Sequence, residues 1–149
     1  MDPTESGGTA PRRAGIDLAA VPESVRAARA FMASMLDVWS CDDMDRVVEL
    51  LTSEIVSNAV RHASGPIRVE AALGDDGSLR VAATDDHPAA PALRDADPEA
   101  EGGRGIRLVQ RLARRWGVET ADGHKLVWFE TTVAHRPRAP SRSLPSPAG

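Results

Sequence analysis

The chain has 149 residues and a formal net charge of −4; 27% of its residues are charged and 42% are hydrophobic. This length fits one domain with a hydrophobic core, and the acidic balance argues against a nucleic-acid binder held by bulk electrostatics. A single cysteine excludes a disulfide framework and a thiolate metal cluster. No apolar run approaches the roughly 20 residues that cross a bilayer, and the first residues lack a signal-peptide core. We therefore expect a cytoplasmic protein that spans no membrane.

Both ends of the chain have the composition of unfolded segments. Residues 1–14 are rich in Gly, Pro and polar side chains, and residues 134–149 are rich in Pro, Ser and Arg. Neither segment has enough apolar side chains to form a core. We expect one folded domain at 15–133 between two disordered ends.

The first part of this domain has helical periodicity. A short edge strand is expected at 16–20, and an amphipathic helix at 22–39, where Pro occupies the first helical position. A second helix is expected from about residue 44 to residue 62 or 63. Either Asp42 or Asp43 can cap it, because both stand just before its first turn.

The second part changes to the alternation typical of strands. The predicted elements are strands at 67–73 and 79–84, a loop at 85–103, a helix at 104–116, and strands at 118–121 and 126–133. The strands arrive as hairpins, which favours a mostly antiparallel sheet. The sequence therefore predicts an α+β fold, a two-layer sandwich with four to five strands covered on one face by three helices. The long internal loop is typical of a functional lid.

The second predicted helix carries two polar residues on its apolar face. Glu54 and Asn58 are one turn apart and fall on the arc that also holds Leu50, Leu51 and Ile55. Burying such groups without partners costs on the order of several kcal/mol. A metal-bound polyphosphate is one candidate ligand, because carboxylate and amide oxygens both bind hard cations. An internal helix cap or a buried Glu–Arg pair is the alternative that spacing leaves open.

Two further stretches are suited to a ligand. Asp85, at a strand end, can accept a hydrogen bond from an exocyclic amine, or it can cap a turn. The run Gly102–Gly105 leads into the third predicted helix, where free backbone N–H groups favour an anion. The same run can also be purely structural. No Walker-type phosphate loop is present, and the histidines show no metal-ligand spacing.

These stretches together resemble a known family. EIVSNAVRHA at 54–63 is similar to the N-box of the ATPases shared by histidine kinases, gyrase and Hsp90. More narrowly, SEIVSNAVRHA, EGGRGIRLVQRLARRWGVE and KLVWFE resemble the small bacterial anti-sigma-factor serine/threonine kinases. The resemblance covers about residues 16–133 and implies the Bergerat ATPase fold.

The resemblance also implies a ligand and a role for each site residue. The protein would bind ATP with Mg²⁺, sequester a sigma factor, phosphorylate Ser or Thr on an antagonist protein, and often pair as a homodimer. Asn58 would hold Mg²⁺, Glu54 would act as base or water-positioner, and Asp85 would bind the adenine amine. The phosphate and hinge contacts at the end of the lid would be Gly103, Arg104 and Gly105.

The chain departs from the family pattern in places that bear on activity. Residues 85–89 lack both glycines of the usual DxGxG motif, and Leu126 stands where a Thr near the adenine is usual. The lid is also acidic, which would repel a triphosphate. These departures favour an alternative, an interaction module on the same fold that transfers no phosphate. A detached histidine-kinase ATPase domain is a third interpretation, which the missing phosphoacceptor helix pair disfavours.

Overall fold

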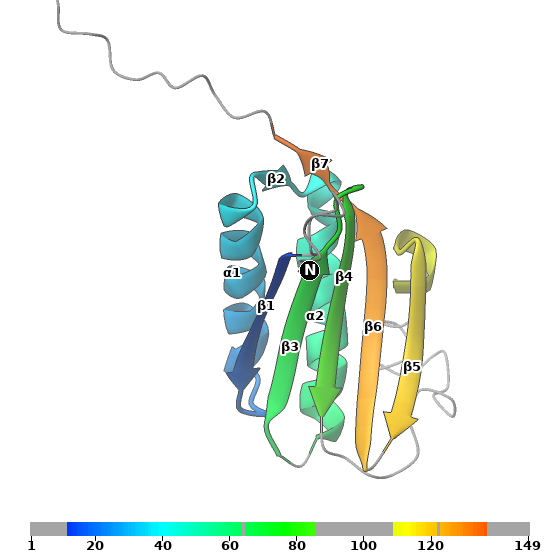
Figure 1. Ribbon diagram of the computed structural model, residues 1–149. Coiled ribbons are helices and arrows are strands. Elements are labelled where there is room, and N and C mark those ends of the chain that lie inside the picture. Colours follow the sequence, from blue (N-terminus) through cyan, green and yellow to red (C-terminus); the bar gives the residue numbers. More distant parts are fainter. Residues whose placement is uncertain (1–11, 64, 86–108, 122, 137–149) are drawn as a thin grey trace, which may run out of the picture.

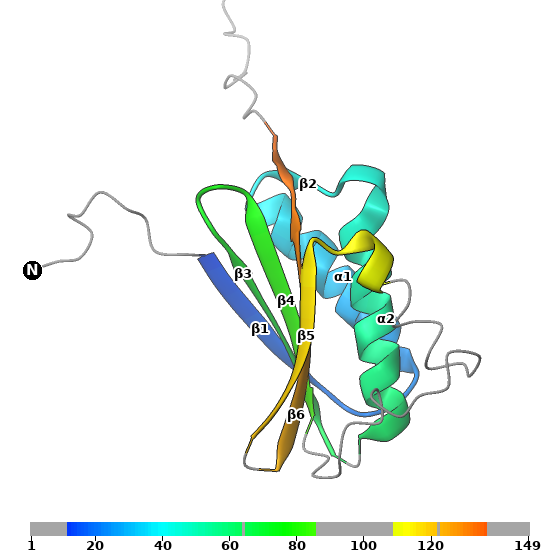
Figure 2. The same cartoon turned by 90° about the vertical axis from the view of Figure 1, so that its right-hand side faces the viewer.

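A computed structural model describes residues 12–63, 65–85, 109–121 and 123–136. The main sheet has five antiparallel strands in the order β1-β3-β4-β6-β5, and the helices lie against one of its faces (Figures 1 and 2). Its strands are β1 (Arg12–Leu18), β3 (Ile67–Leu73), β4 (Ser78–Asp85), β5 (Arg115–Ala121) and β6 (His124–Thr132). The helical layer contains α1 (Glu23–Val38), α2 (Val47–His62) and a short helix at 109–112. This arrangement confirms the predicted two-layer α+β fold.

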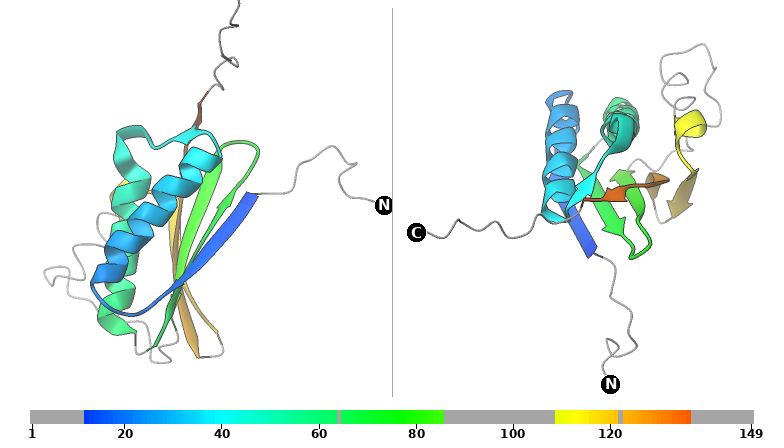
Figure 3. Two further views of the ribbon diagram at one scale, coloured as in Figure 1. Left: turned by 90° about the vertical axis from the view of Figure 1, so that its left-hand side faces the viewer. Right: turned by 90° about the horizontal axis from the view of Figure 1, so that it is seen from above.

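Both long helices bury one stripe of small and apolar residues. In α1 the buried positions recur every four residues: Ser24, Ala28, Met32 and Leu36. The stripe of α2 packs on β4, β6 and β3, and all three helices lie on the same side of the sheet (Figure 3). Leu50 was expected on this buried arc, but it is 39% exposed and lies outside the stripe. Within the described ranges, no helix has the length and apolarity of a membrane span.

A carboxylate fixes the start of α2. The 3-10 turn η2 (Met44–Arg46) precedes the helix, and the side chain of Asp43 reaches past it. Asp43 Oδ1 accepts a hydrogen bond from the backbone N–H of Val48 at 2.7 Å, and Oδ2 accepts one from Glu49 at 2.9 Å. Of the two candidate caps in the sequence, Asp43 is therefore the one whose side chain caps the helix.

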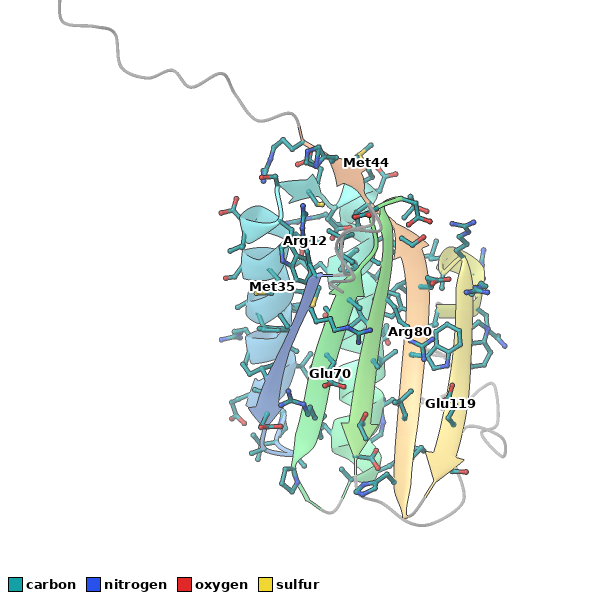
Figure 4. The ribbon with its side chains drawn as sticks, viewed as in Figure 1. Arg12, Met35, Met44, Glu70, Arg80 and Glu119 are labelled. Atoms are coloured by element: carbon teal, nitrogen blue, oxygen red, sulfur yellow. The ribbon has the colours of Figure 1, made fainter. Side chains whose placement is uncertain are left out.

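The strand alternation sorts side chains between two faces of the sheet. In β3 the residues Ile67, Val69, Ala71 and Leu73 are buried under the helices, while Arg68 is exposed on the other side. The side chains of Glu70, Arg80 and Glu119 likewise lie on the side away from the helices (Figure 4). The single core thus lies between the sheet and the helical layer.

Three predicted boundaries were wrong. The third helix was expected to reach Trp116, but residues 109–112 are helical and Trp116 lies in β5, paired with Phe129. Pairing along the whole of β6 satisfies the backbone of this segment as strand. At the N-terminus, β1 includes residues 12–14, which were assigned to the disordered end. At the C-terminus, β7 (Ala134–His135) lies in the expected tail and pairs with β2 (Cys41–Asp42).

Candidate nucleotide-binding site

Polar groups from three elements gather at one end of the core. The C-terminal half of α2, the last residue of β4 and the first residues of β6 lie at the same end of the molecule (Figures 1 and 2). Asp85 closes β4 and is the register partner of Lys125 in β6. Helix α2 packs on both of these strands.

Asn58 supplies an amide oxygen that the described fold does not use. The residue is 3% exposed, and its Oδ1 has no hydrogen-bond partner among the described residues. Its neighbours Ile55 and Ala59 are buried in the core. A buried amide group without a partner costs about 1–3 kcal/mol in proteins, so such groups nearly always have one. The oxygen is therefore suited to a ligand, and a hard cation is the chemistry that an amide oxygen fits.

Glu54 lies one helical turn before Asn58 at the edge of the buried stripe. It is half-buried, in contrast to the fully buried Ile55 beside it. Glu54 forms no ion pair with any residue in the described ranges, so they do not contain the Glu–Arg pair that the sequence left open. A half-buried carboxylate is accessible from solvent, and carboxylates are among the side chains that can accept a proton.

Asp85 lies inside the sheet and not in a turn. It is 2% exposed, and its register partners are Ile67 in β3 and Lys125 in β6. Strand pairing on both sides fixes the backbone of this residue in the sheet. A buried carboxylate at this point can accept hydrogen bonds from an amine on a bound ligand.

Lys125 is the functional candidate that sequence reasoning missed. It is 2% exposed and lies on the helix-facing side of β6 beside Asp85. Burial lowers the pKa of Lys125, and the negative charge of Asp85 partly opposes that shift. The available signal was that this is the only lysine of the chain and that it begins the alternating run KLVWF.

The structure also corrects the expectation about Leu126. This residue is half-buried and borders a groove of about 430 Å³ on the opposite face of the sheet, together with Arg80 and Ala82. Because adjacent strand residues point to opposite faces, Leu126 cannot stand beside the carboxylate of Asp85. The position next to that carboxylate belongs to Lys125.

The remaining predicted site residues lie outside the described part of the chain. These are Gly103, Arg104 and Gly105, which belong to the range 86–108. The predicted lid falls in the same range, apart from Asp85. Of the predicted site residues, the structure describes Glu54 and Asn58 on α2 and Asp85 at the end of β4, and it adds Lys125 opposite Asp85 as a further candidate.

Comparison with known proteins identifies the family. Residues 18–131 match the family model of the histidine kinase-like ATPase domain. The chain belongs to this family. A search of curated proteins finds no match.

Two solved structures resemble this histidine kinase-like ATPase domain. One contains the RsbU and RsbW domains of Rv1364c from Mycobacterium tuberculosis, with a TM-score of 0.65 and 23% identity over 85% of this chain and 33% of that one. The other is the histidine kinase domain of a blue-light activated histidine kinase from Erythrobacter litoralis EL346. Its TM-score is 0.46, with 27% identity over 58% of this chain and 43% of that chain. The chain spans about a third of the mycobacterial structure, and the likeness to that structure establishes a shared fold.

Proposed function

We propose that this protein is an ATP-binding regulator of the anti-sigma-factor type. It sequesters a sigma factor and transfers the γ-phosphoryl group of Mg-ATP to a Ser or Thr of an antagonist protein. Membership of the histidine kinase-like ATPase family and the fold shared with the RsbW-containing structure support this proposal. The observation that carries it is the buried amide oxygen of Asn58, which has no partner among the described residues.

The chemistry of Asn58 suits a magnesium ion bound to phosphates. Mg²⁺ usually takes only one or two ligands from the protein and completes its octahedron with water and phosphate oxygens. A single neutral oxygen from Asn58 fits that role, because the triphosphate itself supplies the negative charge. The bound ion would neutralise charge on the phosphates during transfer.

Each of the other residues has a role that its position supports. Glu54, half-buried one turn before Asn58, would accept the proton of the attacking hydroxyl or position that group. Asp85, buried at the end of β4, would accept a hydrogen bond from the adenine amine. Phosphoryl transfer depends mainly on positioning and charge neutralisation, so a short set of groups can suffice. We assign the phosphate and hinge contacts to Gly103, Arg104 and Gly105.

A transfer assay on Glu54 tests the enzymatic part of this proposal. The protein is incubated with Mg²⁺, γ-labelled ATP and a candidate antagonist protein from the same organism. Loss of a positioned general base reduces rates by about 10²–10⁴-fold, so Glu54→Gln should lose at least 100-fold in transfer while it still binds ATP. Glu49→Gln is the matched control, since Glu49 lies on the same helix and pairs with Arg46 at 3.3 Å. Transfer by Glu54→Gln at the wild-type rate would contradict the assigned role.

A second candidate function is an interaction module that binds partners without phosphoryl transfer. The observation that favours it is the absence, at residues 85–89, of both glycines of the usual DxGxG motif. Under this proposal the wild type captures a sigma factor, yet no label reaches any antagonist protein. Label transfer that depends on Glu54 would exclude it.

The partners follow from the same proposal. The protein would act in the cytoplasm on a sigma factor and an antagonist, with two copies pairing through α1 or the exposed sheet. Pull-down from the source organism with and without ATP identifies these partners, and light scattering measures the oligomeric state. A sigma factor recovered in an ATP-dependent manner is the expected result.

A further inference from the structure

Packing alone does not explain why position 125, in the buried face of β6, is a lysine. Its neighbours on the same face of the strand, Val127 and Phe129, are apolar and 1% and 0% exposed. An apolar side chain at position 125 would continue this pattern. Replacing a buried charge pair by apolar residues of similar volume is often neutral or stabilising, so the fold alone does not require the pair of Asp85 and Lys125.

The position of this ammonium relative to Asp85 is defined by the sheet. Asp85 and Lys125 are directly opposite in the antiparallel register of β4 and β6, and both side chains are on the face covered by α2. Neighbouring strands lie about 4.8 Å apart, and opposed residues on one face are close enough to act on one ligand. The pair presents one hydrogen-bond acceptor and one donor next to each other.

This donor–acceptor pair matches one edge of adenine. The exocyclic amine of adenine is a donor, and it is flanked by two ring nitrogens, N1 and N7, that are acceptors. If Asp85 accepts from the amine, a donor standing beside Asp85 lies next to one of those nitrogens. Guanine presents a carbonyl oxygen where adenine has the amine, so it places an acceptor against the carboxylate.

We propose that Lys125 reads the base in the nucleotide site, donating a hydrogen bond to the ring nitrogen beside the adenine amine that Asp85 binds. This inference rests on the proposed ATP binding and adds a specificity-determining residue to it. The hydrogen bond is charge-assisted and lies in a site shielded from water, so it contributes more than a neutral, exposed one. It also gives the buried ammonium a second partner, besides Asp85, whenever nucleotide is bound.

Base analogues test this role directly. Affinities are measured by calorimetry for Mg²⁺ complexes of ATP, 1-deaza-ATP and 7-deaza-ATP, each of which lacks one of the two ring nitrogens. The proteins are the wild type, Lys125→Met and the matched control Leu126→Met, whose side chain is on the opposite face of β6. We expect the wild type to bind one of the two analogues about tenfold or more weakly than ATP. Lys125→Met should bind ATP and that analogue within about twofold of each other, whereas Leu126→Met should keep the wild-type preference.

The outcomes separate this inference from the function on which it rests. Equal binding of ATP and both analogues by the wild type would overturn the base-reading role while leaving ATP binding intact. Tighter binding of GTP than of ATP, or an unchanged preference in Lys125→Met, would also overturn it. Absence of any nucleotide binding by the wild type would contradict the proposed function itself. The comparison within the wild type can still overturn the base-reading role even if Lys125→Met fails to fold.

Discussion

Lys125 places an ammonium group in the core with only 2% of the residue exposed. At the same end of the molecule, Asp85 is as deeply buried and Asn58 almost as deeply. Each of the three opposes folding unless a partner offsets its lost hydration. Such buried polar groups are typical of a binding site. They contribute to the affinity for the ligand and lower the stability of the protein without ligand.

The stability of a double variant, Asp85→Leu with Lys125→Met, should show this conflict. Burial lowers the pKa of Lys125, so between its folded pKa and the unfolded value near 10.4 the unfolded chain binds more protons. Wild-type stability therefore rises with pH across that window. Without nucleotide at pH 7, we expect this double variant, which replaces both members of the buried charge pair, to be between equal in stability and about 2 kcal/mol more stable. The advantage should shrink as pH approaches 10.4, as followed by urea unfolding. A gap that widens with pH would contradict this account.

Residue identities alone could predict part of the site and not the rest. Glu54, Asn58 and Asp85 were recognisable because a helical period and a strand end place them without knowledge of the tertiary structure. Lys125 was not, since its importance depends on the register between β4 and β6, which brings it opposite Asp85. Lys125 and Leu126 are adjacent in β6, so their side chains lie on opposite faces of the sheet.

At the scale of elements, the start of α2 depends on one side chain. The preceding residues Asp45 and Arg46 both have φ of 58°, a conformation that non-glycine residues adopt only rarely. The two hydrogen bonds that the carboxylate of Asp43 accepts from the helix N-terminus offset this strain. The helix that carries Asn58 is thereby fixed at its first turn.

Removing this cap should destabilise the whole domain. We expect Asp43→Ala to lower the free energy of unfolding by about 1–2 kcal/mol, measured by thermal or urea unfolding. Asp42→Ala is the matched control, because Asp42 is exposed and contacts Arg136 at 3.7 Å, a surface pair that contributes about 0–1 kcal/mol. Equal losses in the two variants would argue against the capping role.

Elements with a local cause were predictable, and elements with a distant cause were not. Helix α2 and the hairpin of β3 and β4 were found because period and turn residues define them along the chain. Trp116 was assigned to a helix, but its strand pairs with β6 along its whole length. The small sheet of β2 and β7 pairs Cys41 with His135, more than ninety positions apart in the sequence. No local sequence pattern predicts such a distant pairing.

Across the whole molecule, the sheet face away from the helices carries a network of charges. Arg68 contacts Asp17 at 3.0 Å, and Arg115 contacts Glu130 at 2.8 Å. The Arg80 guanidinium lies 4.1 Å from the centre of the Trp128 ring. This face is therefore an ordered surface of ion pairs and one stacked aromatic.

Gly117 in β5 leaves room for the indole ring of Trp128, because it has no side chain. A Cβ added at Gly117 would lie 2.7 Å from Nε1 of Trp128, so Gly117→Ala must displace the indole and disturb its stacking on Arg80. We expect a loss of about 1–3 kcal/mol in unfolding free energy and a shift in tryptophan emission. Gly15→Ala is the matched control on the same face. Its nearest contact is the flexible end of Arg68 at 2.6 Å, so it should change stability by less than about 0.5 kcal/mol. Unchanged stability and emission in Gly117→Ala would contradict this packing.

We propose above all that the C-terminal half of α2 forms the metal and phosphate side of a nucleotide site. One calorimetric titration tests this proposal directly. ATP is titrated into the wild type, Asn58→Ala and the control Ser53→Ala, once with Mg²⁺ and once with EDTA. Ser53→Ala is the control because the hydroxyl of Ser53 donates to the carbonyl of Glu49 at 3.0 Å within the helix. The wild type and Ser53→Ala should bind ATP on the order of tenfold more tightly with Mg²⁺ than without it, because an interaction with a charged group contributes about 1.5–3 kcal/mol. Asn58→Ala should lose that enhancement. Failure of the wild type to bind Mg-ATP, or an equal Mg²⁺ enhancement in Asn58→Ala, would contradict the claim.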